Sequence, residues 1–156
     1  MATRREIYNL LYNTACKLYD EGEARHIAEM LTLAKGNISR NDLIIEPNKE
    51  LIISDLDTII SELLNWRPVQ YIIGCADFRD MELTVREGVL IPRPETEELV
   101  EWIASEAADG TKILDIGTGS GAIAIALSRE ISNSRVWAMD ISKEALTIAR
   151  ENSKRY

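Results

Sequence analysis

The chain has 156 residues, of which 46% are hydrophobic, and its 26 acidic and 18 basic side chains give a formal net charge of −8. The length suits one ordinary domain, or a small domain joined to part of another, and the apolar fraction favours a packed core over disorder. The negative charge argues against a protein that grips nucleic acid by bulk electrostatics. We therefore expect no direct nucleic-acid partner.

The first part of the chain has helical periodicity. Thr3, with Glu6 three residues further on, predicts a capping box at the start of a first helix. A second helix is expected to end at Gly36 as its C-terminal cap, and SRNDLIIEP predicts a short capped helix that Pro47 ends.

A fourth helix is expected from about Lys49 to Asn65, because apolar residues recur there at steps of three and four. These residues are Ile52, Leu56, Ile59, Ile60, Leu63 and Leu64. Short helices are not stable alone, so the four should pack into a small bundle. We expect residues 1–67 to form a helical domain.

After residue 67 the period becomes that of strands. We expect two short strands with a glycine-containing turn at REG, residues 86–88, and a β-hairpin connector over residues 68–92. The apolar residues that predict the strands are Phe78, Met81, Leu83 and Val85 before the turn and Val89 and Ile91 after it.

The remaining residues, 93–156, alternate between helices and strands. PRPETEELVEWIASEAADG predicts a helix, with Pro and acidic residues in its first turn and Gly110 beyond its end. KILDIG and RVWAMDI then read as strands, each followed by a helix, in GAIAIALSREI and SKEALTIARENS. This β-α-β-α order is the opening of a doubly wound, Rossmann-like parallel sheet, so the fold class expected for the whole chain is α + α/β.

Gly117, Gly119 and Gly121 lie where the first of these strands turns into a helix, the edge at which open α/β sheets bind ligands. The first two glycines allow a sharp turn and a close approach to a ligand, and Gly121 allows helix and strand to pack closely. Asp140 ends the next strand, where a carboxylate can accept hydrogen bonds from both hydroxyls of a ribose. The pattern predicts a nucleoside cofactor.

Two cofactors fit the glycines, because the spacing to Ala122 also satisfies the pattern for dinucleotides. Asp115 would repel a pyrophosphate, whereas it could pair with the ammonium group of S-adenosylmethionine. S-adenosylmethionine is therefore favoured over a nicotinamide dinucleotide; a third interpretation is a plain turn in which Asp115 is a partner of the helix cap. The candidate cofactor-binding residues are Asp115, Gly117, Thr118, Gly119, Gly121, Asp140 and Ile141.

These residues resemble a known superfamily and, more closely, one of its families. DIGTGSG with AMDIS resembles the class I S-adenosylmethionine-dependent methyltransferases over about residues 112–153. RPVQYIIG and VLIPRPETEELVEW are similar to the HemK family, the protein-glutamine N5-methyltransferases of peptide-chain release factors. The resemblance is weak over the first 65 residues and strong from Arg67 onward.

The resemblance implies transfer of a methyl group from S-adenosylmethionine to the side-chain amide of the glutamine in the Gly-Gly-Gln loop of release factors. Residues 93–156 would be the N-terminal part of the cofactor-binding domain, and the helical domain would grip the release factor. It also puts the PRPETE turn, with Arg93, Glu95 and Thr96, beside the cofactor and the target glutamine. From the residues alone this turn is a helix start.

The family's catalytic Asn-Pro-Pro-Tyr motif does not occur in these 156 residues. We expect the chain to be an N-terminal fragment of such an enzyme, with no catalytic residue of its own and no activity alone. The two parallel strands would present apolar faces and an unpaired edge, which predicts self-association.

Two other classes of function remain. One is a module that binds S-adenosylmethionine or a protein without turnover. The other is an amino-methyltransferase that acts on nucleic acid or on another protein, although the absence of a basic stripe speaks against nucleic acid. Cys16 and Cys75 fit no metal spacing, and the sequence has no secretory signal or membrane-spanning run. We expect a cytoplasmic protein without a metal.

Overall fold

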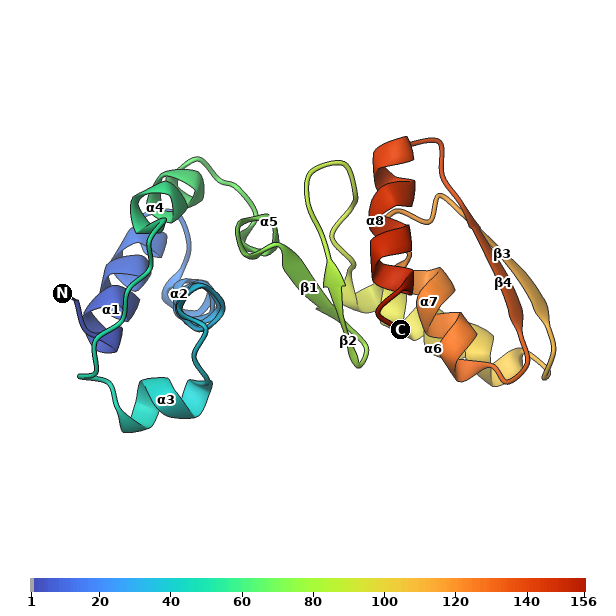
Figure 1. The fold of residues 1–156 in the computed structure, drawn as a ribbon, viewed down its shortest axis with the longest axis horizontal. Coiled ribbons are helices and arrows are strands. Elements are labelled where there is room, and N and C mark those ends of the chain that lie inside the picture. The colour runs from blue at the N-terminus through green and yellow to red at the C-terminus, as the bar shows by residue number, and fades with distance from the viewer. Residues whose placement is uncertain (1) are drawn as a thin grey trace. The chain divides into compact units, whose positions relative to one another are not determined.

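The computed structural model describes residues 2–156, and the chain divides into two compact units, Met1–Ile73 and Gly74–Tyr156 (Figure 1). Helices make up the regular structure described in the first unit, and the second combines two two-stranded sheets with three helices. The roles predicted for residues 1–67, 68–92 and 93–156 stay predictions, because a compact unit says nothing of function.

Side-chain caps mark the starts of the first three helices of the first unit. Thr3 and Glu6 form the predicted capping box, and Ser39 with Asp42 forms another one at the short third helix. Asp20 caps the second helix with its carboxylate. Such side chains accept from N–H groups that the helix itself leaves unpaired. The helices are α1 (Arg4–Ala15), α2 (Glu21–Gly36), α3 (Arg40–Ile45), α4 (Leu56–Leu64) and α5 (Val69–Ile73).

The end of α2 differs from the prediction by one residue. Gly36 is still helical, and Asn37 is the C-cap, in the left-handed conformation with φ of 47°. Asparagine tolerates this conformation better than most residues with a side chain. A Cβ on Gly36 would lie 3.0 Å from a methyl carbon of Leu51. Gly36 therefore allows close packing against Leu51, and the asparagine turns the chain.

The predicted start of the fourth helix near Lys49 is wrong, because α4 begins at Leu56. Ser54 and Asp55 before it form a turn, and Glu50, in the extended segment that precedes the turn, forms an isolated antiparallel bridge with Thr3. In this extended segment Ile52 is 74% exposed, while the residues on either side of it are buried. Pairing with the N-terminal segment has overridden a helical pattern.

The first unit encloses one apolar core, which confirms the predicted bundle, although the short helix α3 supplies none of its buried residues. Helices α1 and α2 supply most of it, and α4, α5 and the extended segment complete it. Removal of this much apolar surface from water is the main stabilising term for such a unit. The buried residues are Ile7, Leu11, Ala15, Ala24, Ile27, Ala28, Leu31, Leu51, Ile53, Ile59, Leu63 and Ile72.

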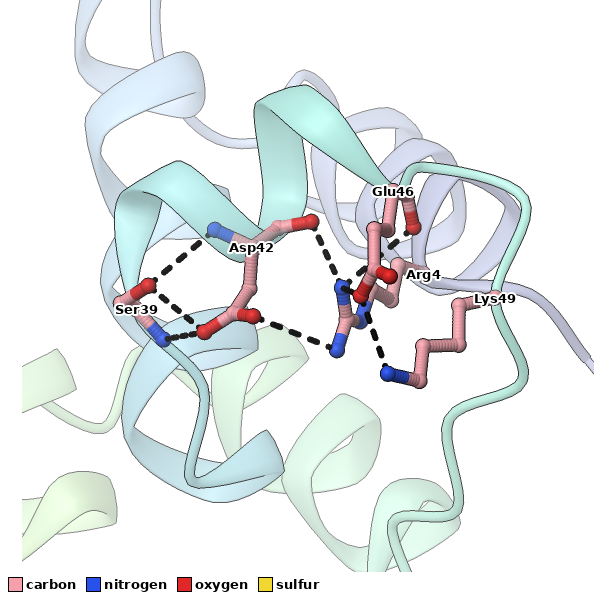
Figure 2. A network of polar contacts seen from close by, with 5 residues as sticks. All are labelled: Arg4, Ser39, Asp42, Glu46 and Lys49. Atoms are coloured by element: carbon pink, nitrogen blue, oxygen red, sulfur yellow. Dashed lines mark hydrogen bonds and ion pairs between the residues drawn. The ribbon is translucent and has the colours of Figure 1, made fainter.

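Arg4 carries a buried charge that ties the N-terminus to α3 (Figure 2). Its Nη1 donates to the carbonyl oxygen of Asp42 at 2.7 Å and to that of Glu46 at 3.4 Å, and it lies 3.1 Å from Glu46 Oε2. Its Nη2 lies 3.6 Å from Asp42 Oδ1. Both carbonyl oxygens also accept a backbone N–H, that of Glu46 at Asp42 and that of Lys49 at Glu46, so the guanidinium adds a second donor at the end of α3.

The second unit begins with an antiparallel hairpin and continues with alternating helices and strands. The order confirms the predicted fold class of a helical bundle, a hairpin and the opening β-α-β-α portion of a Rossmann-like sheet. The elements are β1 (Cys75–Phe78), β2 (Met81–Thr84), α6 (Pro94–Glu106), β3 (Lys112–Ile116), α7 (Ala122–Glu130), β4 (Arg135–Met139) and α8 (Lys143–Ser153).

A hairpin forms within residues 68–92, as predicted, but its turn is not at residues 86–88, and the strand predicted at Val89 and Ile91 is wrong because residues 85–93 contain no strand. Phe78 pairs with Met81, so Arg79 and Asp80 make the turn. Arg79 has a φ of 48°, and its guanidinium donates to both carboxylate oxygens of Glu130 on α7, at 2.5 and 3.0 Å. Tertiary contacts thus hold a residue in a conformation that its own sequence does not favour.

Strands β3 and β4 pair in parallel, with Leu114 opposite Trp137. Helices α6, α7 and α8 lie on one side of this pair (Figure 1). Side chains on the other side have no cover within the described residues. Those side chains are Leu114, Ile116, Trp137 and Met139, which are 49–73% exposed. Residues two apart in a strand share a face, so the four form one apolar surface, here called the bare face.

Candidate functional site

The glycine turn, residues 117–121, joins β3 to α7 at the carboxyl end of the parallel strands. The N–H groups of Gly117 and Thr118 both donate to the carbonyl oxygen of Met139, at 2.8 and 3.0 Å. The last residue of β4 therefore anchors the start of the turn. Gly117, Gly119 and Gly121 all have positive φ, at 81°, 55° and 85°. A residue with a Cβ would be strained at each of the three.

The three glycines face different surroundings. A Cβ on Gly117 or Gly119 would meet no atom within 4 Å, so this side of the turn is open. A Cβ on Gly121 would lie 3.2 Å from the Cβ of Ala149 on α8 and 3.1 Å from Ile125 Cδ1. The predicted role of Gly121 in packing a helix against a strand is thus corrected, because its close neighbour on another element belongs to a helix.

Asp140 follows β4, and its carboxylate contacts the backbone of the glycine turn. Its Oδ2 accepts from the N–H of Gly119 at 2.9 Å, and its Oδ1 accepts from the N–H of Ser142 at 2.9 Å. The backbone N–H of Ser142, and then that of Gly119, lower the pKa of Asp140 below its ordinary value of 3.8. Acid that protonates this carboxylate would weaken both bonds, so their contribution is present above that ordinary value and is lost as pH falls through the lowered pKa.

Asp115 lies at the other side of the turn, and its surroundings leave its predicted role open. The hydroxyl of Thr118 donates to Asp115 Oδ2 at 2.7 Å, and Thr118 itself is buried. A carboxylate can accept up to about four hydrogen bonds, so this contact leaves capacity for a ligand. The same contact also fits the plain turn.

In the part of the chain that the structure describes, the other predicted site residues do not form hydrogen bonds or ion pairs with the residues of the glycine turn. Ile141 is fully exposed, and Arg93 and Glu95 are exposed at the start of α6. The N–H of Thr96 donates to the carbonyl oxygen of Arg93 at 3.0 Å, as at an ordinary helix start. Within residues 2–156 no hydrogen bond or ion pair links these positions to the glycine turn.

Asn152 is a polar residue at this site that the sequence pattern did not single out. It is buried on α8, and its amide donates to the carbonyl oxygen of Ser120 inside the turn, at 2.9 Å. One signal could have found it, because it continues the apolar face of α8. That face is Ala145, Ile148, Ala149 and Asn152. A polar residue at such a position must find partners in the interior.

No group of three or more His, Cys, Asp and Glu side chains that could hold a metal ion occurs among the described residues. Cys16 and Cys75 are free thiols, and burial, followed by the charge of Glu82, raises the pKa of Cys75 to about 11. None of the helices in residues 2–156 is long and apolar enough to cross a membrane.

Comparison with known proteins indicates the class of protein to which the fold and the glycine turn belong. Residues 93–156 match the family of ribosomal protein L11 methyltransferase (PrmA). The matched region covers α6, both parallel strands, the glycine turn and Asp140. The second unit therefore contains part of a methyltransferase domain with a Rossmann-like sheet.

Relatives that match along both units define the family. The chain is 51% identical over 132 residues to a release factor glutamine methyltransferase of Lactococcus lactis, covering 83% of this chain and 47% of the relative. It is 43% identical over 154 residues to one of Streptococcus pneumoniae, covering 96% and 55%. The chain belongs to the family of release factor glutamine methyltransferases, as its resemblance to the HemK family predicts. It spans about half the length of the curated relatives it matches.

Proposed function

We propose that the whole protein to which these residues belong transfers a methyl group from S-adenosylmethionine to a glutamine side-chain amide in the Gly-Gly-Gln loop of a peptide-chain release factor. The observation that carries this proposal is the identity of 37–51% to relatives named release factor glutamine methyltransferase. For the Streptococcus pneumoniae relative that identity covers the helical unit as well as the sheet.

The residues of the glycine turn fit the proposed cofactor. The open side at Gly117 and Gly119 leaves room for a ligand to approach the backbone. Asp140 already holds two backbone N–H groups, which fix its orientation and keep it charged, and its remaining lone pairs suit the two hydroxyls of a ribose. Asp115 offers a negative charge for an ammonium group. When bound, S-adenosylmethionine supplies an electrophilic methyl group on a sulfonium.

Residues outside the glycine turn are proposed to position the target amide. The Asn-Pro-Pro-Tyr sequence expected from the family does not occur in residues 1–156, so we assign no catalytic residue here. Methyl transfer from a sulfonium depends on alignment of the attacking nitrogen more than on a strong base. We propose that Arg93, Glu95 and Thr96 line the approach of the glutamine, and that the helical unit binds the release factor.

The cofactor is tested with Asp140→Ala in the whole protein, with Asp109→Ala as the control, since Asp109 is an acidic residue in the loop before β3. Calorimetry should show that D140A weakens S-adenosylmethionine binding by about 5- to 150-fold, because unpaired ribose hydroxyls cost about 1–3 kcal/mol. D109A should bind like the unaltered protein. An unchanged affinity in D140A, or tight binding of a nicotinamide dinucleotide, would contradict the assignment.

The substrate is tested with radiolabelled S-adenosylmethionine and two acceptors. The unaltered whole protein should label a release factor, and replacement of the glutamine in its Gly-Gly-Gln loop should abolish labelling. Ribosomal protein L11 is the second acceptor, because residues 93–156 match the family named after it. Labelling of L11 or of nucleic acid without labelling of the release factor would overturn the proposal.

A further inference from the structure

Asn152 is completely buried and uses its side-chain amide to join two segments far from it in sequence. The N–H of Thr84, at the end of β2, donates to Asn152 Oδ1 at 2.7 Å. Asn152 Nδ2 donates in turn to the carbonyl oxygen of Thr84 at 3.0 Å and to that of Ser120 at 2.9 Å. The amide thus pairs with both backbone groups of one strand residue and with the centre of the glycine turn.

The chemistry of these three bonds selects asparagine. The site needs one acceptor, facing the Thr84 N–H, and two donors, facing carbonyl oxygens. A neutral primary amide supplies both kinds of group in one plane, whereas an ionised aspartate only accepts. Unpaired buried carbonyls cost free energy, so loss of the amide would weaken the link between the two backbone segments.

Other contacts tie α8 to the hairpin but stop short of the glycine turn. Arg86 and Glu151 form a paired ion contact at 2.7 and 2.9 Å, and Arg155 with Tyr156 contacts Glu82. These groups are exposed, and exposed ion pairs contribute little. Among the side-chain hydrogen bonds of residues 2–156, those of Asn152 are the ones that reach both segments.

We propose that Asn152 is a positioning residue that couples the glycine turn to the end of β2. A ligand that orders the turn then also orders the chain from Thr84 toward α6, where Arg93 lies. Such coupling is reciprocal, so ordering of the hairpin tightens ligand binding at the turn. The inference rests on the proposed function only for the identity of the ligand, S-adenosylmethionine.

The ligand-free test uses hydrogen exchange, resolved by residue, in the 156-residue chain. Asn152→Asp should speed amide exchange near both segments, at Val85 and at Gly121, by about tenfold or more at neutral pH. Burial is expected to raise the pKa of this aspartate, and below that pKa the protonated acid regains one donor. After correction for the intrinsic pH dependence of amide exchange, the protection of Val85 and Gly121 should then partly return. The control Glu151→Gln breaks the neighbouring ion pair and should leave Gly121 unchanged. An effect of N152D confined to one segment, or an equal effect of E151Q at Gly121, would overturn the proposal.

The ligand test uses the whole protein with S-adenosylmethionine. In the unaltered protein and in E151Q, saturating ligand should slow exchange at Thr84 and Val85; in Asn152→Ser, ligand should slow exchange at the turn alone. If the ligand binds the unaltered protein without any slowing at Thr84, the coupling does not exist, a result that needs no variant. If S-adenosylmethionine does not bind at all, the proposed function fails, while the ligand-free result still decides the coupling.

Discussion

The two units of this chain differ in how fully they bury their apolar residues. In the helical unit Leu11, Leu31 and Leu63 are completely buried, because the apolar stripes of α1, α2 and α4 face one another. In the other unit α6, α7 and α8 lie on one side of the β3–β4 pair (Figure 1), and Leu114 and Ile116 on the bare face are 55% and 73% exposed. A helix needs one covered stripe, whereas a parallel sheet has two faces to cover, so equally apolar sequences reach different degrees of burial.

The largest effect expected from this comparison is a difference between two leucine truncations. Leu11→Ala should lower the free energy of unfolding of the helical unit by about 2–5 kcal/mol, because it leaves a cavity in a closed core. At a dilution where the chain is monomeric, Leu114→Ala on the bare face should cost less than about 1 kcal/mol. Denaturant titration monitored by hydrogen exchange measures the unfolding of each unit separately. Equal losses would mean that the bare face is covered in solution.

A pair of glycine substitutions isolates the packing of α7 against α8. Gly121→Ala and Gly110→Ala both force alanine into a positive φ, at 85° and 77°, which costs about 1–2 kcal/mol each. Only Gly121 adds close contacts, with Ala149 and Ile125. G121A should therefore be less stable than G110A by about a further 1–3 kcal/mol in thermal unfolding. Identical unfolding of both variants would show that α7 and α8 accommodate the added methyl group without a loss of stability.

Arg4 tests whether a polar contact also holds the helical unit together. Arg4→Met keeps the apolar volume but removes the charged donor that links the N-terminus to the carbonyl oxygens and carboxylates of Asp42 and Glu46, and should lower stability by about 1–3 kcal/mol. The exposed Lys49→Met is the control and should have a small effect. A fully stable R4M, as judged by chemical denaturation, would mean that the contacts of Arg4 add nothing to the stability of this unit.

Acid should weaken the same region. The Ser39 hydroxyl and N–H lower the pKa of Asp42, and Lys49 and then Arg4 lower that of Glu46. The stabilisation from both carboxylates is complete above their ordinary values of 3.8 and 4.5 and is lost as pH falls through the lowered pKa values. Asp42→Asn with Glu46→Gln should flatten the acid limb of a stability–pH curve for this unit. An unchanged acid limb would show that other carboxylates govern it.

Substitutions on the bare face are expected to have the smallest effect on folding. Their effect on self-association of the chain is easier to measure. We expect this chain to self-associate through the bare face, because a continuous apolar surface of this kind favours contact with another copy. Trp137→Lys with Met139→Lys should shift sedimentation velocity toward monomer, whereas Trp102→Lys, at an exposed position on α6, should not. Monomeric behaviour of the unaltered chain at all concentrations would contradict this expectation.

The sequence by itself determined the features that depend on neighbouring residues. The capping box of Thr3 and Glu6, the β-α-β-α order and the glycine turn followed from local spacing, because caps, periodicity and positive φ act within a few residues. The place of Asp140 at the edge that carries the glycine turn also followed from pattern, since parallel strands end at the same edge of a sheet, whereas its hydrogen bond from Gly119 was seen only in the structure.

Only the tertiary structure decided the contacts between distant segments. Glu50 is extended because it pairs with Thr3, although the local pattern there is helical, and the hairpin turns at Arg79 because Glu130 on another element holds it. Asn152 gave only a weak signal, a polar residue on an apolar face, because its partners at Thr84 and Ser120 lie 68 and 32 positions away along the chain. Local propensities differ by about 1 kcal/mol or less per residue, so one buried hydrogen bond or strand pairing of similar size is enough to override them.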